Sequence, residues 1–267
     1  MNVAVLGAGI VGRTLATGWA RAGHHVVLGS RDPDAERGRD AVAETGASGA
    51  AEHAAAARSS DVAVVTVPGE QVDALVAQVG DALAGRVVVD ATNVLAPGAP
   101  DLHHVDALRA AGATVFRAFS TTGWEQMARP LFGDQRCDLP WAGPDGPGRD
   151  RVEQLVTDIG FRPVWLGDDA EALELMDALT RVWFRLAFRQ GWGRRTGLRF
   201  LTDDSRPDVS QFHRRFGPLP QELWRRAWDC WAVTRAPIRV RCARRRRRKA
   251  RARYVRPRCA IRPPSRA

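Results

Sequence analysis

The sequence contains few of the residues that signal a metal site or a disulfide framework. It has four cysteines, and Cys137 is the only one before position 230. Cys230, Cys242 and Cys259 follow without a C-x-x-C pair, so their spacing does not fit a zinc site, and we expect no bound metal. In a cytosolic chain these cysteines stay reduced.

Long apolar runs are also missing. No stretch approaches the ~20 apolar residues of a membrane-spanning helix. The first residues, MNVAVL, lead directly into a glycine motif without the basic start of a secretory signal. We therefore expect a cytoplasmic protein that does not bind membranes.

Lysine is nearly absent, and the basic residues are unevenly distributed. Residues 201–267 hold 20 of the 40 basic residues and five of the 30 acidic ones, a net charge of +15. Residues 1–200 carry a net charge of −5. This asymmetry predicts an Arg-rich tail over residues 202–267, which is either disordered or derived from a frameshift of GC-rich DNA. Nucleic acid would bind only through this tail, at the basic run 244–249.

In the body of the chain, apolar stretches alternate with stretches of helical periodicity. This alternation predicts an α/β protein with a Rossmann-like, doubly wound parallel sheet. We expect an NADP-binding domain over residues 1–166 and a small helical portion over residues 167–201. The predicted strands are 2–6, 25–28, 61–67, 86–90, 113–118, 139–142 and 162–166. The predicted helices are 10–21, one that opens at 32–33, one that ends at 83, 149–159 and 169–188.

A glycine motif, G-x-G-x-x-G, follows the first predicted strand and opens the first predicted helix. Gly7 suits a tight turn, Gly9 lets the backbone approach a pyrophosphate, and Gly12 permits close packing of helix and strand. The amide groups at the start of the helix would then bind the phosphates. Because strand, glycines and helix occur in the required order, we predict dinucleotide binding.

The end of the second predicted strand indicates which dinucleotide binds. An NAD site places an acidic residue there to bind the ribose 2′-hydroxyl. This chain instead has Ser30 and Arg31, a hydroxyl and a planar cation that suit a 2′-phosphate. Alternatively, this segment is an exposed turn in which Asp32 caps a helix. We predict NADP(H) as the cofactor.

Together with later segments, the Gly29-Ser30-Arg31 turn resembles the NADPH-dependent F-420 reductase family, whose members act with a deazaflavin coenzyme. The resemblance extends over roughly residues 1–201. The segments that carry it are VTVP at 65–68, VDATN at 89–93, RAFSTT at 117–122, LAF at 186–188, GWG at 191–193 and GLRFL at 197–201.

The resemblance implies hydride transfer between NADP(H) and a deazaflavin (F-420-like) or flavin-like partner, in a protein that often forms a homodimer. It places Gly9, Ile10 and Val11 along the pyrophosphate, with Ser30 and Arg31 on the 2′-phosphate. It places Val67, Pro68 and Asn93 beside the nicotinamide half.

Hydride transfer requires alignment more than acid–base groups, so no catalytic residue is assigned from sequence. Ser120 and Thr121 follow a strand and either orient a substrate or cap their own loop. Two alternatives stay open. One is an NADPH-dependent reductase of a small imine or carbonyl compound. The other is a non-catalytic NADP(H)-responsive protein whose basic tail binds nucleic acid.

Overall fold

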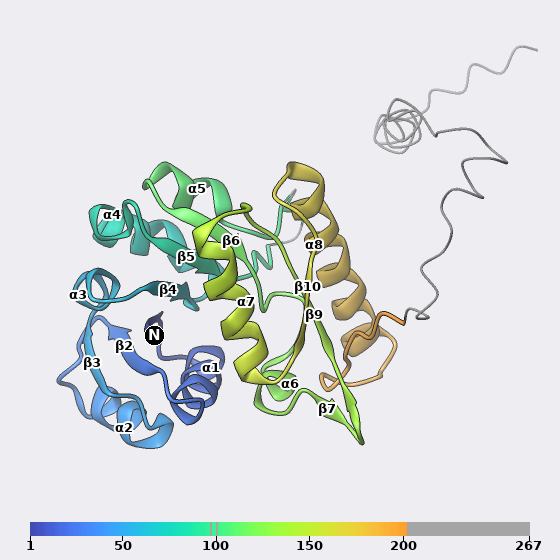
Figure 1. Cartoon of the computed structure of the whole chain (residues 1–267), viewed down its shortest axis with the longest axis horizontal. Helices are drawn as coiled ribbons and strands as arrows, with labels where there is room; N and C mark the ends of the chain where they lie inside the picture. The colour runs from blue at the N-terminus through green and yellow to red at the C-terminus, as the bar shows by residue number, and fades with distance from the viewer. Residues whose placement is uncertain (97, 100, 202–267) are drawn as a thin grey trace, which may run out of the picture. The chain divides into compact units, whose positions relative to one another are not determined.

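The computed structural model describes residues 1–96, 98–99 and 101–201. Its centre is a six-stranded, fully parallel sheet with the order β3-β2-β1-β4-β5-β6 (Figure 1). The strands are β1 (Asn2–Leu6), β2 (His25–Ser30), β3 (Gly49–Glu52), β4 (Val62–Val65), β5 (Val87–Asp90) and β6 (Thr114–Arg117). The predicted Rossmann-like, doubly wound architecture is confirmed.

The apolar runs in the sequence become the central strands. All four residues of β4 are buried, as are the last four of β1, because helices cover both faces of the sheet. Val3 pairs with Val26 on one side and Val62 on the other. The strand order reverses between β1 and β4, which places a crevice at the carboxyl ends of these two strands.

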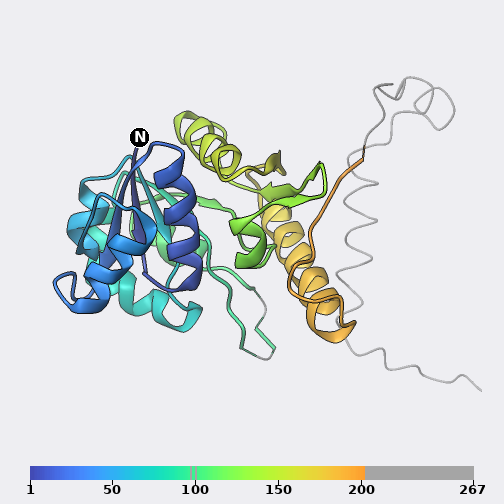
Figure 2. The same cartoon turned by 90° about the horizontal axis from the view of Figure 1, so that it is seen from below.

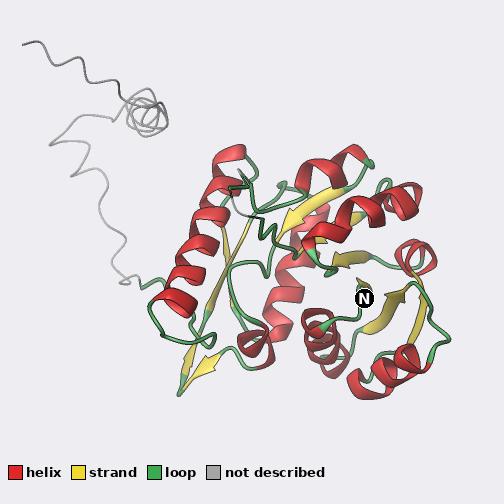
Figure 3. Ribbon diagram, turned by 180° about the vertical axis from the view of Figure 1, so that it is seen from behind, coloured by secondary structure: helices red, strands yellow, loops and turns green. Residues whose placement is uncertain are grey.

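Helices cover the two faces of the sheet in separate groups (Figures 1 and 3). On one face, α1 packs against α2 and α7 around an apolar core that includes Trp19 and Leu155. On the other face, α3, α4 and α5 enclose a second core that includes Leu75 and Leu108. Their bounds are α1 (Ile10–Arg21), α2 (Glu36–Thr45), α3 (His53–Arg58), α4 (Val72–Leu83), α5 (Val105–Ala110) and α7 (Pro147–Ile159).

Between β6 and α8 (Ala170–Phe184) the chain also forms a short helix and two small two-stranded sheets beside the main sheet (Figure 2). After the short helix α6 (Trp124–Ala128) comes a hairpin of β7 (Leu131–Phe132) and β8 (Gln135–Arg136). Next, β9 (Asp138–Trp141) and β10 (Arg162–Trp165) pair in parallel as a separate two-stranded sheet. A single antiparallel bridge between Arg117 and Ala142 joins this small sheet to β6.

The last described helix, α8 (Ala170–Phe184), is shorter than the predicted helix 169–188. Asp169 caps it by accepting a hydrogen bond from the Ala172 backbone amide at 2.8 Å. The final turn, Arg185–Arg189, widens to a π-helix, η2. The periodicity of the apolar residues continues across this change and therefore did not reveal it.

Two further differences concern local structure. The helix predicted to open at residues 32–33 begins only at Glu36, because Asp32 instead closes a turn by accepting a hydrogen bond from Ala35 N at 3.1 Å. Sequence reasoning also did not predict β3, α3, α5 and the β7–β8 hairpin. These elements are two to six residues long, too short to show a clear period.

Among the described residues, no helix is long and apolar enough to cross a membrane. The predicted Arg-rich tail, residues 202–267, lies outside the described residues.

Candidate functional site

The three motif glycines lie at the carboxyl end of β1, beside the point where the strand order reverses. Gly7 has a φ of 122°, which favours glycine, and a Cβ atom there would lie 2.8 Å from Val67 N. A Cβ atom at Gly12 would overlap the carbonyl oxygen of Gly7. Thr66 reinforces this contact, since its hydroxyl donates to the same carbonyl at 2.8 Å.

Gly9 differs from its two neighbours in the motif, because a Cβ atom there would meet nothing within 4 Å. It is the N-cap of α1, where no side chain caps the helix and the first turn carries no acidic residue. The next residue, Ile10, is 57% exposed, and Val11 is half-buried. Free amide groups, the positive end of the helix dipole and open space fit the pyrophosphate of a dinucleotide.

The end of β2 carries the residues predicted to hold the 2′-phosphate. Ser30 and Arg31 are accessible, and the Ser30 hydroxyl also interacts with the Asp32 backbone at 3.2 Å. Glu52, exposed at the end of β3, pairs in register with Ser30. Glu52 is thus the acidic residue on the strand next to Ser30, a neighbour that only the strand order reveals.

His53 lies directly beneath this turn and was not predicted as a site residue. It is 5% exposed, and its Nδ1 atom has no hydrogen-bond partner within the described part of the chain. A Cβ atom at Gly29 would lie 2.9 Å from that nitrogen. Burial, and secondly the charge of Arg31, lower the pKa of His53 from its ordinary value.

The residues predicted for the nicotinamide half follow β4 and β5. Val67 touches Gly7, and the backbone after Pro68 comes so close to Asn93 that a Cβ atom at Gly69 would overlap the Asn93 carbonyl oxygen. All ten predicted cofactor residues thus lie at the carboxyl edge of the sheet or at the start of the helix that follows it. Their contacts with a cofactor stay a prediction.

A buried polar network fixes Asn93. Its Oδ1 atom accepts from Arg117 Nη2 at 2.9 Å, and its Nδ2 atom donates to the Ser120 carbonyl at 3.0 Å. Arg117 also donates to Asp90 Oδ2 at 3.2 Å and approaches Asp177 Oδ1 at 3.5 Å. Asp90 and Arg117 end neighbouring apolar strands, and that shared position was the available sequence signal for their pairing.

The loop after β6 contains strained and unsatisfied groups. Phe119 has a φ of 62°, the only positive φ among the described non-glycine residues. The Ser120 and Thr121 hydroxyls are buried and have no hydrogen-bond partner within the described residues. The structure therefore gives these hydroxyls no role in capping their own loop.

Cys137 belongs to a different region. It lines a cavity of about 420 Å³ together with Phe132, Arg136, Trp192 and Arg199. Burial, the largest influence, raises the pKa of its thiol, which disfavours the nucleophilic thiolate.

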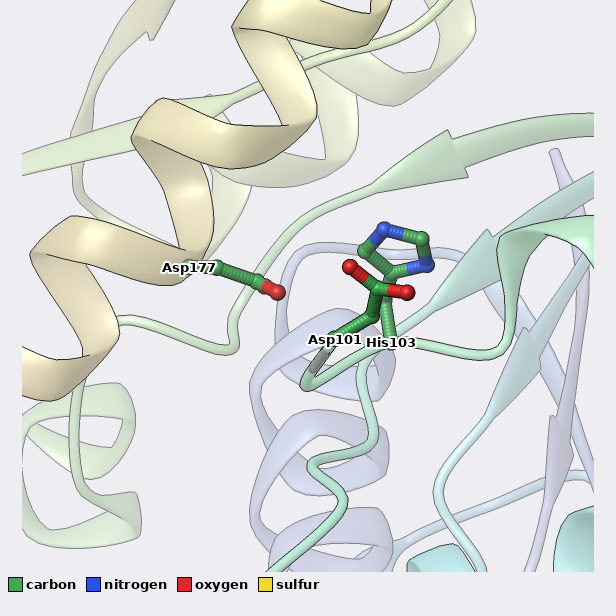
Figure 4. A group of neighbouring side chains, drawn as sticks. All are labelled: Asp101, His103 and Asp177. Atoms are coloured by element: carbon green, nitrogen blue, oxygen red, sulfur yellow. The ribbon is translucent and has the colours of Figure 1, made fainter. Parts of the chain in front are cut away.

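Asp101, His103 and Asp177 form a group whose ligand atoms lie within 4.8 Å of one another (Figure 4). Asp177 points from α8 toward the other two residues, which belong to the loop before α5. Its Oδ2 atom already accepts from Leu102 N at 2.6 Å, and its Oδ1 atom faces Arg117. We assign no metal to this group, because the carboxylate anchors the loop through protein contacts. The expectation of no bound metal stays a prediction.

Comparison with known proteins shows which family the N-terminal part of the chain resembles. Residues 2–94 match the family model described as NADP oxidoreductase, coenzyme F420-dependent. Over these residues the chain is similar to this family of NADP oxidoreductases. It is therefore an NAD(P)-binding oxidoreductase, and binding of NADP(H) is typical of the family.

Individual relatives agree with the family assignment. A crystal structure from Arthrobacter sp. FB24, which carries the provisional name F420-dependent NADP reductase, is 27% identical with a TM-score of 0.64. The match covers 76% of this chain and 100% of that one. An imine reductase from Streptomyces aurantiacus (21% identity, TM-score 0.56, 72% of this chain and 64% of that one) shares the fold.

A curated relative, the metalloreductase STEAP3 of Rattus norvegicus, is 28% identical over 180 residues. The match covers 65% of this chain but only 35% of STEAP3, so this chain spans about a third of that relative's length.

Proposed function

We propose that this protein transfers a hydride between NADP(H) and a deazaflavin coenzyme of the F420 type, with a flavin-like compound as the chemically related partner. The observation that carries the proposal is the match to the Arthrobacter protein with the provisional name F420-dependent NADP reductase, over that protein's full length. The matches to the imine reductase and to STEAP3 cover 64% and 35% of those chains. The match therefore extends over the full length of a protein with that provisional name, which supports the F420-type acceptor over the alternatives.

The geometry supports NADP(H) at the carboxyl edge of the sheet. The pyrophosphate would lie over Gly9 at the N-terminus of α1, where open space and free amides are available. Ser30 and Arg31 would bind the 2′-phosphate, and Pro68 and Asn93 would border the nicotinamide. When bound, NADPH supplies the hydride, and the protein contributes binding and orientation.

The deciding experiment follows NADPH oxidation by the full chain, with and without coenzyme F420, and repeats both assays with NADH. Oxidation that requires F420 and prefers NADPH supports the proposal. NADPH oxidation with small imines or carbonyl compounds but not with F420 would replace the named acceptor. NADPH binding without turnover on any acceptor would contradict the catalytic proposal and favour a non-catalytic NADP(H)-responsive protein.

We also propose that two copies of the chain associate. Apolar side chains are exposed on the portion after β6 and would be covered in a dimer. They are Leu131, Phe132, Val182, Phe188 and Trp192. Light scattering of the full chain tests this proposal, and a monomer at micromolar concentration would contradict it.

The tail, as the proposed route to nucleic acid, is tested separately by the salt dependence of DNA binding.

A further inference from the structure

We propose that His104 is the proton-transfer residue of this site, held in one tautomer by Thr92 and Asp90. The proposal rests on the proposed function, because a deazaflavin that takes a hydride at a ring carbon must also take a proton to reach its neutral reduced form. The sequence alone assigned no acid or base to this site.

His104 lies at the nicotinamide side of the candidate cofactor site. It is the N-cap residue of α5, after the loop that leaves β5. A Cβ atom at Gly69, directly after Pro68, would lie 3.4 Å from His104 Cε1 and would overlap the Asn93 carbonyl oxygen. The imidazole ring therefore lies close to Pro68 and Asn93, two of the three residues that are predicted to border the nicotinamide.

Hydrogen bonds connect the ring to the buried carboxylate of Asp90. His104 Nδ1 lies 3.0 Å from Thr92 Oγ1, and that hydroxyl lies 2.6 Å from Asp90 Oδ1. The other carboxylate oxygen accepts from the His104 backbone amide at 2.8 Å. Asp90 thus holds the His104 backbone directly and the His104 ring through the Thr92 hydroxyl.

The chemistry of these groups determines the tautomer. Asp90 is the ion-pair partner of Arg117, so its carboxylate only accepts hydrogen bonds. Thr92 has one hydroxyl proton, which it donates to Asp90. Thr92 Oγ1 must then accept from His104, and His104 Nδ1 carries the proton. The Nε2 atom is left with a lone pair in the neutral ring, and within the described residues the ring makes its hydrogen bond only through Nδ1.

A half-buried imidazole with one nitrogen fixed and the other free is suited to proton transfer. In the direction of NADPH oxidation, a hydride leaves NADPH for the acceptor carbon, and the imidazolium of His104 gives its Nε2 proton to the acceptor heteroatom. NADP⁺, the reduced acceptor and neutral His104 result, and a proton from solvent restores the imidazolium. In this step Thr92 and Asp90 position the ring without exchanging a proton with the substrate.

The first test measures structure and requires no turnover. Nitrogen-15 NMR of the full chain, labelled at histidine, reports which ring nitrogen carries the proton. We expect His104 to be protonated at Nδ1 when neutral and to become a mixture of tautomers in Thr92→Val. Protonation at Nε2 in the native chain would overturn the proposal, whichever acceptor the enzyme uses.

The second test measures turnover with the acceptor that supports NADPH oxidation. For His104→Ala we expect kcat to fall on the order of 100-fold, with the dissociation constant of NADPH within about twofold of native. Added imidazole should restore part of kcat, which a purely structural defect would not allow. His103→Gln, the adjacent histidine, is the matched control and should keep native kcat.

Unchanged kcat in His104→Ala, or a loss that imidazole does not rescue, contradicts the proposal. If His104→Ala does not fold, the Thr92→Val variant decides: an unchanged tautomer and native kcat overturn it. Absence of F420-dependent turnover in the native chain counts against the proposed acceptor and leaves the tautomer test intact, so the two failures are distinguishable.

Discussion

Arg117 and Asp90 form an ion pair from which solvent is excluded: Nη1 and Oδ2 lie 3.2 Å apart, and both side chains are 0% exposed. A buried charge that loses its partner is strongly destabilising, because the remaining charge keeps its desolvation cost. This pair also holds Thr92 and Asn93 in place, since Arg117 donates to the Thr92 carbonyl at 2.8 Å and to the Asn93 amide oxygen. Stability and site geometry therefore depend on the same contact.

For Arg117→Met we expect the free energy of unfolding to fall by about 3–5 kcal/mol. Urea denaturation of the native and variant chains measures the change. The control is Arg109→Met, which removes an exposed pair with Asp106 and should cost at most about 0.5 kcal/mol. Equal losses in the two variants would show that the buried pair stabilises the fold no more than an exposed pair does.

Gly9 and Gly12 should respond differently to the same substitution. Gly9→Ala places a methyl group in open space where the pyrophosphate is expected, so NADPH affinity should fall on the order of tenfold with little loss of stability. Gly12→Ala forces a Cβ atom against Gly7 O and should cost about 1–3 kcal/mol. Fluorescence titration of NADPH and thermal denaturation separate the two effects. Undiminished NADPH binding by a folded Gly9→Ala chain would contradict the assigned position of the pyrophosphate.

Arg31 is predicted to discriminate NADPH from NADH. Arg31→Gln should raise the KM for NADPH on the order of tenfold and leave the KM for NADH nearly unchanged, because only NADPH carries the 2′-phosphate. Arg21→Gln, at the far end of α1, is the control and should alter neither value. Glu52→Gln removes a carboxylate from the strand beside Ser30 and should lower the KM for NADPH. A similar loss for both cofactors in Arg31→Gln would argue against a 2′-phosphate contact.

His53 should make stability depend on pH. Its pKa in the folded chain is lowered by burial and by Arg31, so the unfolded chain binds a proton more readily. The free energy of unfolding should therefore fall as the pH drops through the ordinary histidine value of 6.5, and the loss continues down to the lowered value. His53→Gln should reduce the difference in stability between about pH 7.5 and about pH 5.5, as measured by urea denaturation. His25→Gln, at an exposed position on β2, serves as the comparison, and an equal reduction there would contradict the assignment.

Short motifs specify the parts of the site whose chemistry is local. The glycine motif specifies a turn, an open backbone and a close contact within six residues, and Gly7, Gly9 and Gly12 show these three properties in the structure. Continuous apolar strands determined the parallel sheet, because strands buried on both faces carry no polar alternation. The carboxyl ends of such strands meet at one edge, so the predicted cofactor residues lie along that edge.

The contacts between distant polar groups, in contrast, follow from the folded arrangement of strands and helices. Asp90 and Arg117 are 27 positions apart, and Asp177 is a further 60 positions along, so no sequence period relates them. Their contact depends on the order of β5 and β6 in the sheet and on the position of α8 beside the loop that precedes α5. The same holds for His104, whose orientation follows from a hydroxyl twelve residues away and a buried carboxylate. Local chemistry is contained in short motifs, whereas a hydrogen-bond network exists only after the chain has excluded water from the groups that form it.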